Sequence, residues 1–180
     1  MLSIEVPLGE EKWDEVSQEF IEPKTQTLQL EHSLISLSKW ESKWCKPFLS
    51  STKSDEETLD YIRCMTVSTN IDSTVYDHLT SKNIQEIVDY INAPMTATKF
   101  PKEQRSKRKN EIITADIIYY WMITLQIPSE YQKWHLNRLL TLIRVCEIKN
   151  SPPKKRSRSE IAAEYAAINA ARRKQLNTKG

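Results

Sequence analysis

The sequence predicts a mainly α-helical fold with a minor β component: a compact helical domain with one or two short β-hairpins and a C-terminal helical arm. Apolar residues recur at steps of three and four through most of the chain after residue 37, the spacing of amphipathic helices. Apolar and polar residues alternate near the N-terminus instead. Two adjacent prolines, Pro152 and Pro153, separate a predicted body, 1–150, from a basic, Ala-rich arm, 151–180.

The two alternating segments predict a strand pair at the edge of the body. Residues 2–8 and 27–31 both have the period of a half-buried strand. Pro7 cannot donate a hydrogen bond to a neighbouring strand, so it places the first strand near an edge or at its end. We expect these segments to pair, with residues 10–20 between them as a short crossing helix.

Capping patterns predict the next helices. Ser38 and Glu41 have the Ser-x-x-Glu spacing of a capping box, and Ser54 and Glu57 repeat it. Ser81 can cap a third helix, which ends before a proline. The apolar faces of the three helices are, in order, Leu37, Trp40, Trp44 and Phe48; Leu59, Ile62 and Met65; and Ile84, Ile87, Val88 and Ile91.

A hydrophilic insertion is expected in the middle of the chain. Residues 95–98 and 111–113 resemble short extended pieces, and between them residues 99–110 contain six basic residues against one Glu. A long polar segment of this kind is typical of a flexible surface loop.

A pair of antiparallel helices is expected to build the centre of the body. Thr114 can cap the first helix, which Pro128 breaks, and Ser129 and Gln132 have capping-box spacing ahead of the second. The connection, 126–129, is short enough to place the two helices side by side. The predicted core residues of this pair are Trp121, Leu136, Leu139, Leu140 and Ile143.

The residue types argue against several kinds of chemistry. Only two glycines occur, Gly9 and Gly180, whereas phosphate loops, dinucleotide fingerprints and nucleophile elbows need several. The three histidines are isolated, and the three cysteines have neither zinc-site spacing nor an even number for a disulfide framework. No apolar run approaches a membrane span, and no signal peptide is visible. We therefore expect no enzyme, no metal, no cofactor and no membrane insertion.

Charge and aromatic residues favour a binding protein. Residues 1–90 hold 8 basic and 17 acidic residues, whereas residues 91–180 hold 18 and 7, so self-association, internal neutralisation or a charged partner is expected. The candidate basic contacts are Lys154, Lys155, Arg156, Arg172 and Arg173. The stripe Trp40, Trp44 and Phe48 has the spacing of a buried helix face, yet the same residue types anchor protein interfaces. The sequence leaves both interpretations of the stripe open.

Several blocks of the sequence resemble a family of tailed-phage and prophage proteins that are described as tail assembly chaperones. The blocks are HSLISLSKWE (32–41), KPFL (46–49), YIRCM (61–65), PMTAT (94–98), IITA (112–115), IYYWM (118–122), KWHLNRLL (133–140) and NAARR (169–173).

This resemblance implies a protein of the host cytoplasm that binds the tape-measure protein during tail morphogenesis and keeps that long helical chain in solution. It makes the tail-tube protein a second candidate partner and leaves homo-oligomerisation open. A structural component of the virion, such as a connector or minor tail protein, is the first alternative. A nucleic-acid-binding factor that uses the basic arm is the second, because clustered Lys and Arg neutralise phosphates.

Overall fold

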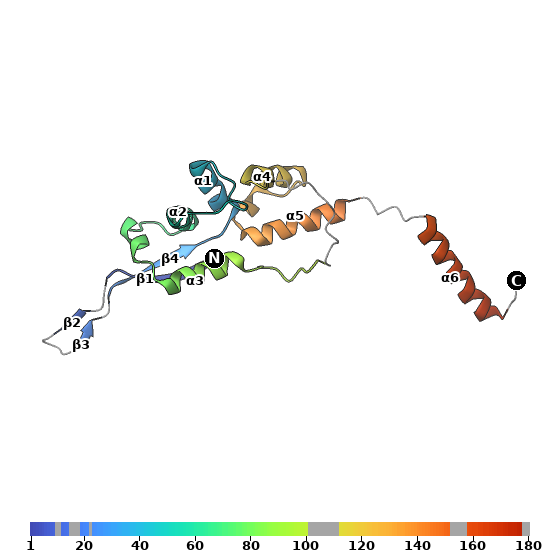
Figure 1. The fold of residues 1–180 in the computed structure, drawn as a ribbon, viewed down its shortest axis with the longest axis horizontal. Coiled ribbons are helices and arrows are strands. Elements are labelled where there is room, and N and C mark those ends of the chain that lie inside the picture. Colours follow the sequence, from blue (N-terminus) through green and yellow to red (C-terminus); the bar gives the residue numbers. More distant parts are fainter. Residues whose placement is uncertain (10–11, 15–18, 22, 101–111, 152–157, 178–180) are drawn as a thin grey trace. The chain divides into compact units, whose positions relative to one another are not determined.

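The computed structural model describes residues 1–9, 12–14, 19–21, 23–100, 112–151 and 158–177 (Figure 1). The chain divides into two compact units, Met1–Glu147 and Ile148–Gly180. The described part is mainly helical, with an antiparallel strand pair at its N-terminus and a helix near its C-terminus, so the predicted fold class is confirmed.

The first strand pair forms as the alternation predicts. Strand β1 (Leu2–Pro7) pairs antiparallel with β4 (Thr25–Leu30), and Leu2 lies opposite Leu30. The apolar residues of both strands face the core, because Ile4, Val6 and Leu28 are buried. Segment 65–67 covers the second edge of β4: the Glu31 amide donates to the Met65 carbonyl at 2.9 Å, and the Val67 amide donates to Gln29 at 2.8 Å.

The predicted crossing helix over residues 10–20 is wrong. Strand β2 (Lys12–Asp14) pairs antiparallel with β3 (Glu19–Ile21) in a second two-stranded sheet. Because β1 and β4 are themselves antiparallel, the chain between them needs only to turn back, and a helical crossover is unnecessary.

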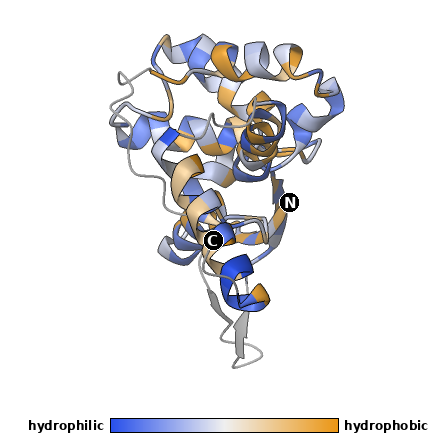
Figure 2. Cartoon of the chain, turned by 90° about the vertical axis from the view of Figure 1, so that its right-hand side faces the viewer, coloured by the Kyte–Doolittle hydropathy of each residue, from blue (hydrophilic) through white to orange (hydrophobic). Residues whose placement is uncertain are grey.

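Helices form the remainder of the body and the arm. Their hydrophobic and hydrophilic positions are mixed along each element (Figure 2). Residues 95–98 and 112–114 contain no strand, and most of the predicted basic loop lies outside the described residues. The elements are α1 (Leu34–Trp44), α2 (Asp55–Met65), η1 (Ser73–His78), α3 (Ser81–Asn92), α4 (Ala115–Thr124), η2 (Ser129–Lys133), α5 (Leu136–Asn150) and α6 (Arg158–Leu176).

One predicted capping box is confirmed and another is displaced. Ser54 and Glu57 cap α2 reciprocally, as expected. Helix α1 begins earlier than predicted, because Ser33 and Ser36 form its capping box and Ser38 lies inside the helix. Helix α3 is capped by Thr80, one residue before the predicted Ser81.

The second half of the body differs more from its prediction. Thr114 is the N-cap of α4, but its side chain makes no capping hydrogen bond. Ser129 and Gln132 do not open the last helix of the body: they lie in the 3₁₀ turn η2, and the Gln132 side chain accepts a hydrogen bond from Tyr119. Helix α5 starts only at Leu136.

Three of the five predicted core residues of the helix pair are confirmed. Leu136, Leu139 and Ile143 are buried, whereas Trp121 and Leu140 are only partly buried against the core. The prediction for Trp121 fails because α4 packs chiefly on α1 and not on α5. The face of α4 that meets the core carries Ala115, Ile118 and Met122, and Trp121 lies to one side of it.

A buried pair of histidines joins the segments of the body. The His32 and His135 rings lie 5.1 Å apart, edge to face. His32 Nδ1 lies 2.6 Å from the Tyr61 hydroxyl of α2, and His135 Nε2 lies 3.0 Å from the Tyr90 carbonyl of α3. The Leu136 amide, at the start of α5, donates to the His32 carbonyl at 2.7 Å. These contacts of His32 and His135 thus connect the segment between β4 and α1 to α2, α3 and α5.

Both histidines of this junction are neutral in the folded protein. Burial, helped by the neighbouring His135, lowers the pKa of His32 to about 3, and burial also lowers the pKa of His135. His135 Nδ1 accepts a hydrogen bond from the Asn137 amide, so its proton is on Nε2, which donates to Tyr90.

Acidification should therefore unfold the body by protonating His32. The unfolded chain binds this proton below its ordinary pKa near 6.5, whereas the folded chain resists it until about pH 3. The contribution of neutral His32 to stability is fully present above about pH 6.5. Between pH 7 and pH 5, its loss alone should lower the free energy of unfolding by about 2 kcal/mol. Urea unfolding at the two pH values measures the loss. His32→Leu should flatten the dependence, and an unchanged slope in that variant would contradict the assignment.

The core should respond to truncation at Leu139, which has no exposed surface. Leu139→Ala should lower the free energy of unfolding by about 2–5 kcal/mol, since it removes buried methyl groups and leaves a cavity. Leu49→Ala is the matched control, because Leu49 is exposed, and it should change little. Thermal melts of both variants check this, and equal melting temperatures would refute the assigned core.

Candidate functional site

Helix α4 is mostly apolar and yet lies at the surface, and Asp116 and Thr124 are its two polar residues. Eight of its ten residues, Ala115–Thr124, are apolar. A helix of this composition is ordinarily buried all round. Here Tyr120 is 65% exposed and Ile123 is 76% exposed. The mismatch between composition and exposure marks this outer face as a candidate interaction surface.

A buried side of α4 fixes the helix in place. Ala115, Ile118 and Met122 are buried, and α1 is the principal packing partner. The Glu41 carboxylate of α1 joins two backbone amides: one oxygen accepts from Ala115 at 2.7 Å, and the other accepts from Phe48 at 2.7 Å. A carboxylate at the first helical residue also complements the helix dipole. The outer face is therefore presented by a helix that is anchored at its N-terminus.

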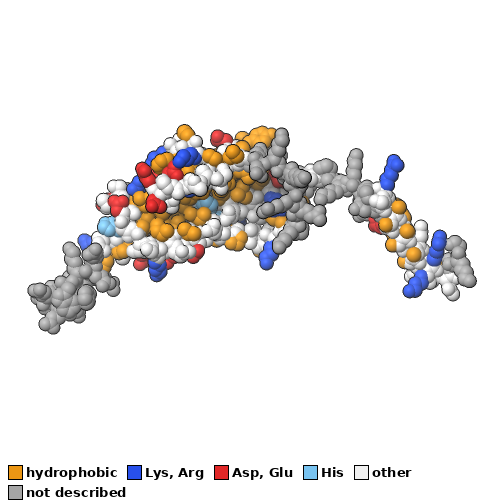
Figure 3. All heavy atoms as spheres, in the orientation of Figure 1, with side chains coloured by type: hydrophobic (Ala, Val, Ile, Leu, Met, Phe, Trp, Pro, Cys, Tyr) orange, Lys and Arg blue, Asp and Glu red, His pale blue; other side chains and the backbone are white. Residues whose placement is uncertain are grey.

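The exposed apolar side chains belong to consecutive turns. Tyr120 and Ile123 are three residues apart and lie on one face of α4. Ile112, which precedes the helix, is also largely exposed. Figure 3 shows hydrophobic side chains gathered over α4. We call Tyr120 and Ile123 the α4 face. Its geometry suits an apolar stripe on a partner and provides no nucleophile or acid–base pair.

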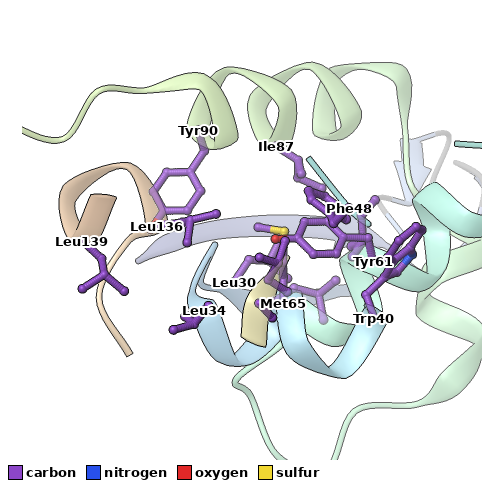
Figure 4. Close-up of a cluster of buried hydrophobic side chains, with 14 of the residues drawn as sticks. Leu30, Leu34, Trp40, Phe48, Tyr61, Met65, Ile87, Tyr90, Leu136 and Leu139 are labelled. Carbon is purple, nitrogen blue, oxygen red and sulfur yellow. The ribbon is translucent and has the colours of Figure 1, made fainter. Parts of the chain in front are cut away.

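The aromatic stripe proposed from sequence belongs to the core. Trp40 has no exposed surface and Phe48 is 7% exposed, so neither is available to a partner (Figure 4). Helix α1 ends at Trp44, and Cys45 adopts a left-handed conformation that brings Phe48 back to pack edge-on against Trp40, with ring centres 5.1 Å apart. The prediction of partner contacts at Trp40 and Phe48 is corrected to core packing.

Trp44 is partly buried, and its indole is engaged within the body. The indole N–H donates to Asp60 Oδ2 at 2.9 Å, and Lys43 forms an ion pair with the same carboxylate at 2.5 Å. Trp44 thus connects α1 to α2 at the rim of the core.

The basic residues proposed as contacts belong to the second unit. Lys154, Lys155 and Arg156 lie outside the described residues. Arg172 and Arg173 are exposed on α6. The same helix exposes the apolar side chains of Ile161, Tyr165, Ile168 and Leu176. Since they are spaced by four, three and eight residues, these side chains lie along one stripe of α6.

The described residues offer neither a metal-binding cluster nor a membrane-spanning helix. They include no group of three His, Cys, Asp or Glu side chains arranged to hold a metal ion. Among them, no helix has both the length and the apolar composition needed to cross a bilayer. Cys45, Cys64 and Cys146 are free thiols.

No protein-family model, no curated protein and no solved structure matches the chain.

The α4 face was missed from sequence although a signal was present. The pattern of helix 115–124 was interpreted as one core face, but apolar residues occur at nearly every position of the helix. A surface helix needs a polar side, and on the exposed side of this one Asp116 and Thr124 alternate with Tyr120 and Ile123. The incomplete polar side was the observation that could have identified Tyr120 and Ile123.

The anchoring of α4 can be tested at Glu41. Glu41→Ala should leave the Phe48 and Ala115 amides without their acceptor and destabilise the body by about 1–3 kcal/mol. Hydrogen exchange measured by NMR should show faster exchange at these two amides. Exchange at the Trp40 indole N–H, which donates to Glu57 in the core, is the internal reference. Unchanged exchange at Ala115 would show that α4 does not depend on this carboxylate.

Proposed function

We propose that this protein is a phage tail assembly chaperone that binds the tape-measure protein through the α4 face, without a catalytic step, in the host cytoplasm. The observation that carries the proposal is a surface helix that is mostly apolar and leaves Tyr120 and Ile123 exposed. The resemblance of the sequence blocks to tail assembly chaperones supplies the identity of the partner.

The α4 face matches what a tape-measure chain presents. Long helices that have not yet assembled expose apolar stripes, and an apolar helix face packs against such a stripe. Tyr120 combines a large apolar ring with a hydroxyl, a combination common among residues that dominate binding energy. Covering the partner's stripe would keep that chain from aggregating until the tail tube polymerises around it.

The second unit offers a further contact for the same task. Helix α6 exposes Arg172 and Arg173 together with an apolar stripe. We assign these residues, with Lys154, Lys155 and Arg156, to acidic stretches of the tape-measure protein. Such charge contacts act mainly on the association rate and weaken with added salt.

Co-expression tests the function directly. The chain should raise the soluble yield of the tape-measure protein and co-purify with it. Tyr120→Ser with Ile123→Ser should weaken binding by about thirtyfold, which corresponds to about 2 kcal/mol at a central apolar contact, and should leave the melting temperature unchanged. Titration of the purified complex measures the affinity.

A matched control is Val88→Ser with Ile148→Ser, which removes two other exposed apolar side chains. This control should bind like the parent chain. No gain in solubility and no co-purification would overturn the proposal. Detection of the chain in purified virions by mass spectrometry would show that it is a structural tail protein and not a chaperone.

A further inference from the structure

A groove opens on the body where α1 runs beside the C-terminal end of α2. Its volume is about 470 Å³, within the range of about 300–1,000 Å³ that ligand sites occupy. Ile35 of α1 and Met65 and Val67 from the end of α2 supply apolar surface in it. Met65 is buried and Val67 is more than half exposed, so the apolar surface continues from the core to the solvent.

Two lysines line this groove from different elements. Lys39 comes from α1 and Lys133 from η2. Neither forms an ion pair with a carboxylate of the described residues. The neighbouring lysines of the α1 region differ, since Lys43 pairs with Asp60 and Lys46 pairs with Glu57. The groove therefore holds two positive charges that this part of the chain does not neutralise.

The one carboxylate that lines the groove is already engaged. Glu31 accepts a hydrogen bond from the Tyr90 hydroxyl at 2.7 Å and pairs with the amino group of Met1 at 2.9 Å. Its side chain is mostly buried. Lys39 lies close enough to Cys64, which also lines the groove, for its charge to lower the pKa of that thiol, although burial raises this pKa overall.

We propose that this groove binds a segment of the tape-measure protein in which a large apolar side chain is flanked by carboxylates. The apolar surface of the groove contacts the apolar side chain, and Lys39 and Lys133 form ion pairs with the carboxylates. Charge complementarity selects this occupant, because the exposed Lys39 and Lys133 would repel a basic segment and would pair with carboxylates. The inference depends on the proposed function and adds to it a contact that discriminates between partner sequences.

Charge reversal tests the groove. Lys39→Glu with Lys133→Glu should weaken binding of the tape-measure protein at least tenfold, and much of the loss should appear at low salt, where such contacts are strongest. Lys24→Glu with Lys149→Glu changes the net charge equally at two exposed lysines outside the groove, and it should change affinity less than twofold. Lys39→Gln with Lys133→Gln should give an intermediate loss of affinity. If the charge-reversal variant does not fold, this neutral variant is used for the test in its place.

Thiol protection provides a second readout at the same place. In a chain carrying Cys45→Ser and Cys146→Ser, Cys64 is the remaining thiol, and its reaction with a disulfide reagent should slow severalfold once the tape-measure protein is bound. Loss of binding in Y120S/I123S without loss in the lysine variants, or an unprotected Cys64, would overturn the groove while leaving the proposed function standing. No binding by the parent chain would overturn both.

Discussion

The contact between the buried rings of His32 and His135 is the constraint on which the rest of the body depends. It joins the β4–α1 corner to the start of α5, and its hydrogen bonds reach Tyr61 of α2 and Tyr90 of α3. A neutral imidazole can accept at one ring nitrogen and donate at the other, so the two rings satisfy polar groups of three segments, α2, α3 and α5. Helix α4 is fixed to this frame through α1 and Glu41. The position of the exposed apolar face therefore follows from a junction that itself contacts no partner.

Local patterns in the sequence predicted the elements that local interactions decide. Alternation identified β1 and β4, and the Ser54–Glu57 capping box identified the start of α2. Prediction failed where distant residues decide the outcome. Helix α4 was expected to pack on α5, which follows it closely in the chain, but it packs on α1 because a carboxylate 74 residues away in sequence accepts its first amide. The spacing of residues within one helix cannot predict a contact between residues so far apart in the sequence.

The candidate site shows the same division between local and distant causes. Trp40 was a reasonable anchor from its residue type, but its indole N–H finds the carbonyl of Glu57 at 2.8 Å within the core. Tyr120 and Ile123 are the opposite case, since they are apolar and exposed. Their helix has only two polar residues, which is visible in the sequence, whereas packing on α1 decides which side of the helix remains exposed. The buried polar contacts fix the body. Its surface then presents the α4 face and the groove with Lys39 and Lys133, and we propose both as contacts for an unassembled helical chain.

The α4 face is the proposed point of contact with the tape-measure protein. The most direct measurement replaces Ile123 with a photo-crosslinking phenylalanine analogue in a chain that is co-expressed with that protein, and identifies the crosslinked peptide by mass spectrometry. The same analogue at Val88, which is exposed on α3, reports non-specific capture. We expect a crosslink from position 123 to an apolar helical stretch of the tape-measure protein and none from position 88. Equal crosslinking from both positions, or none from position 123, would contradict it.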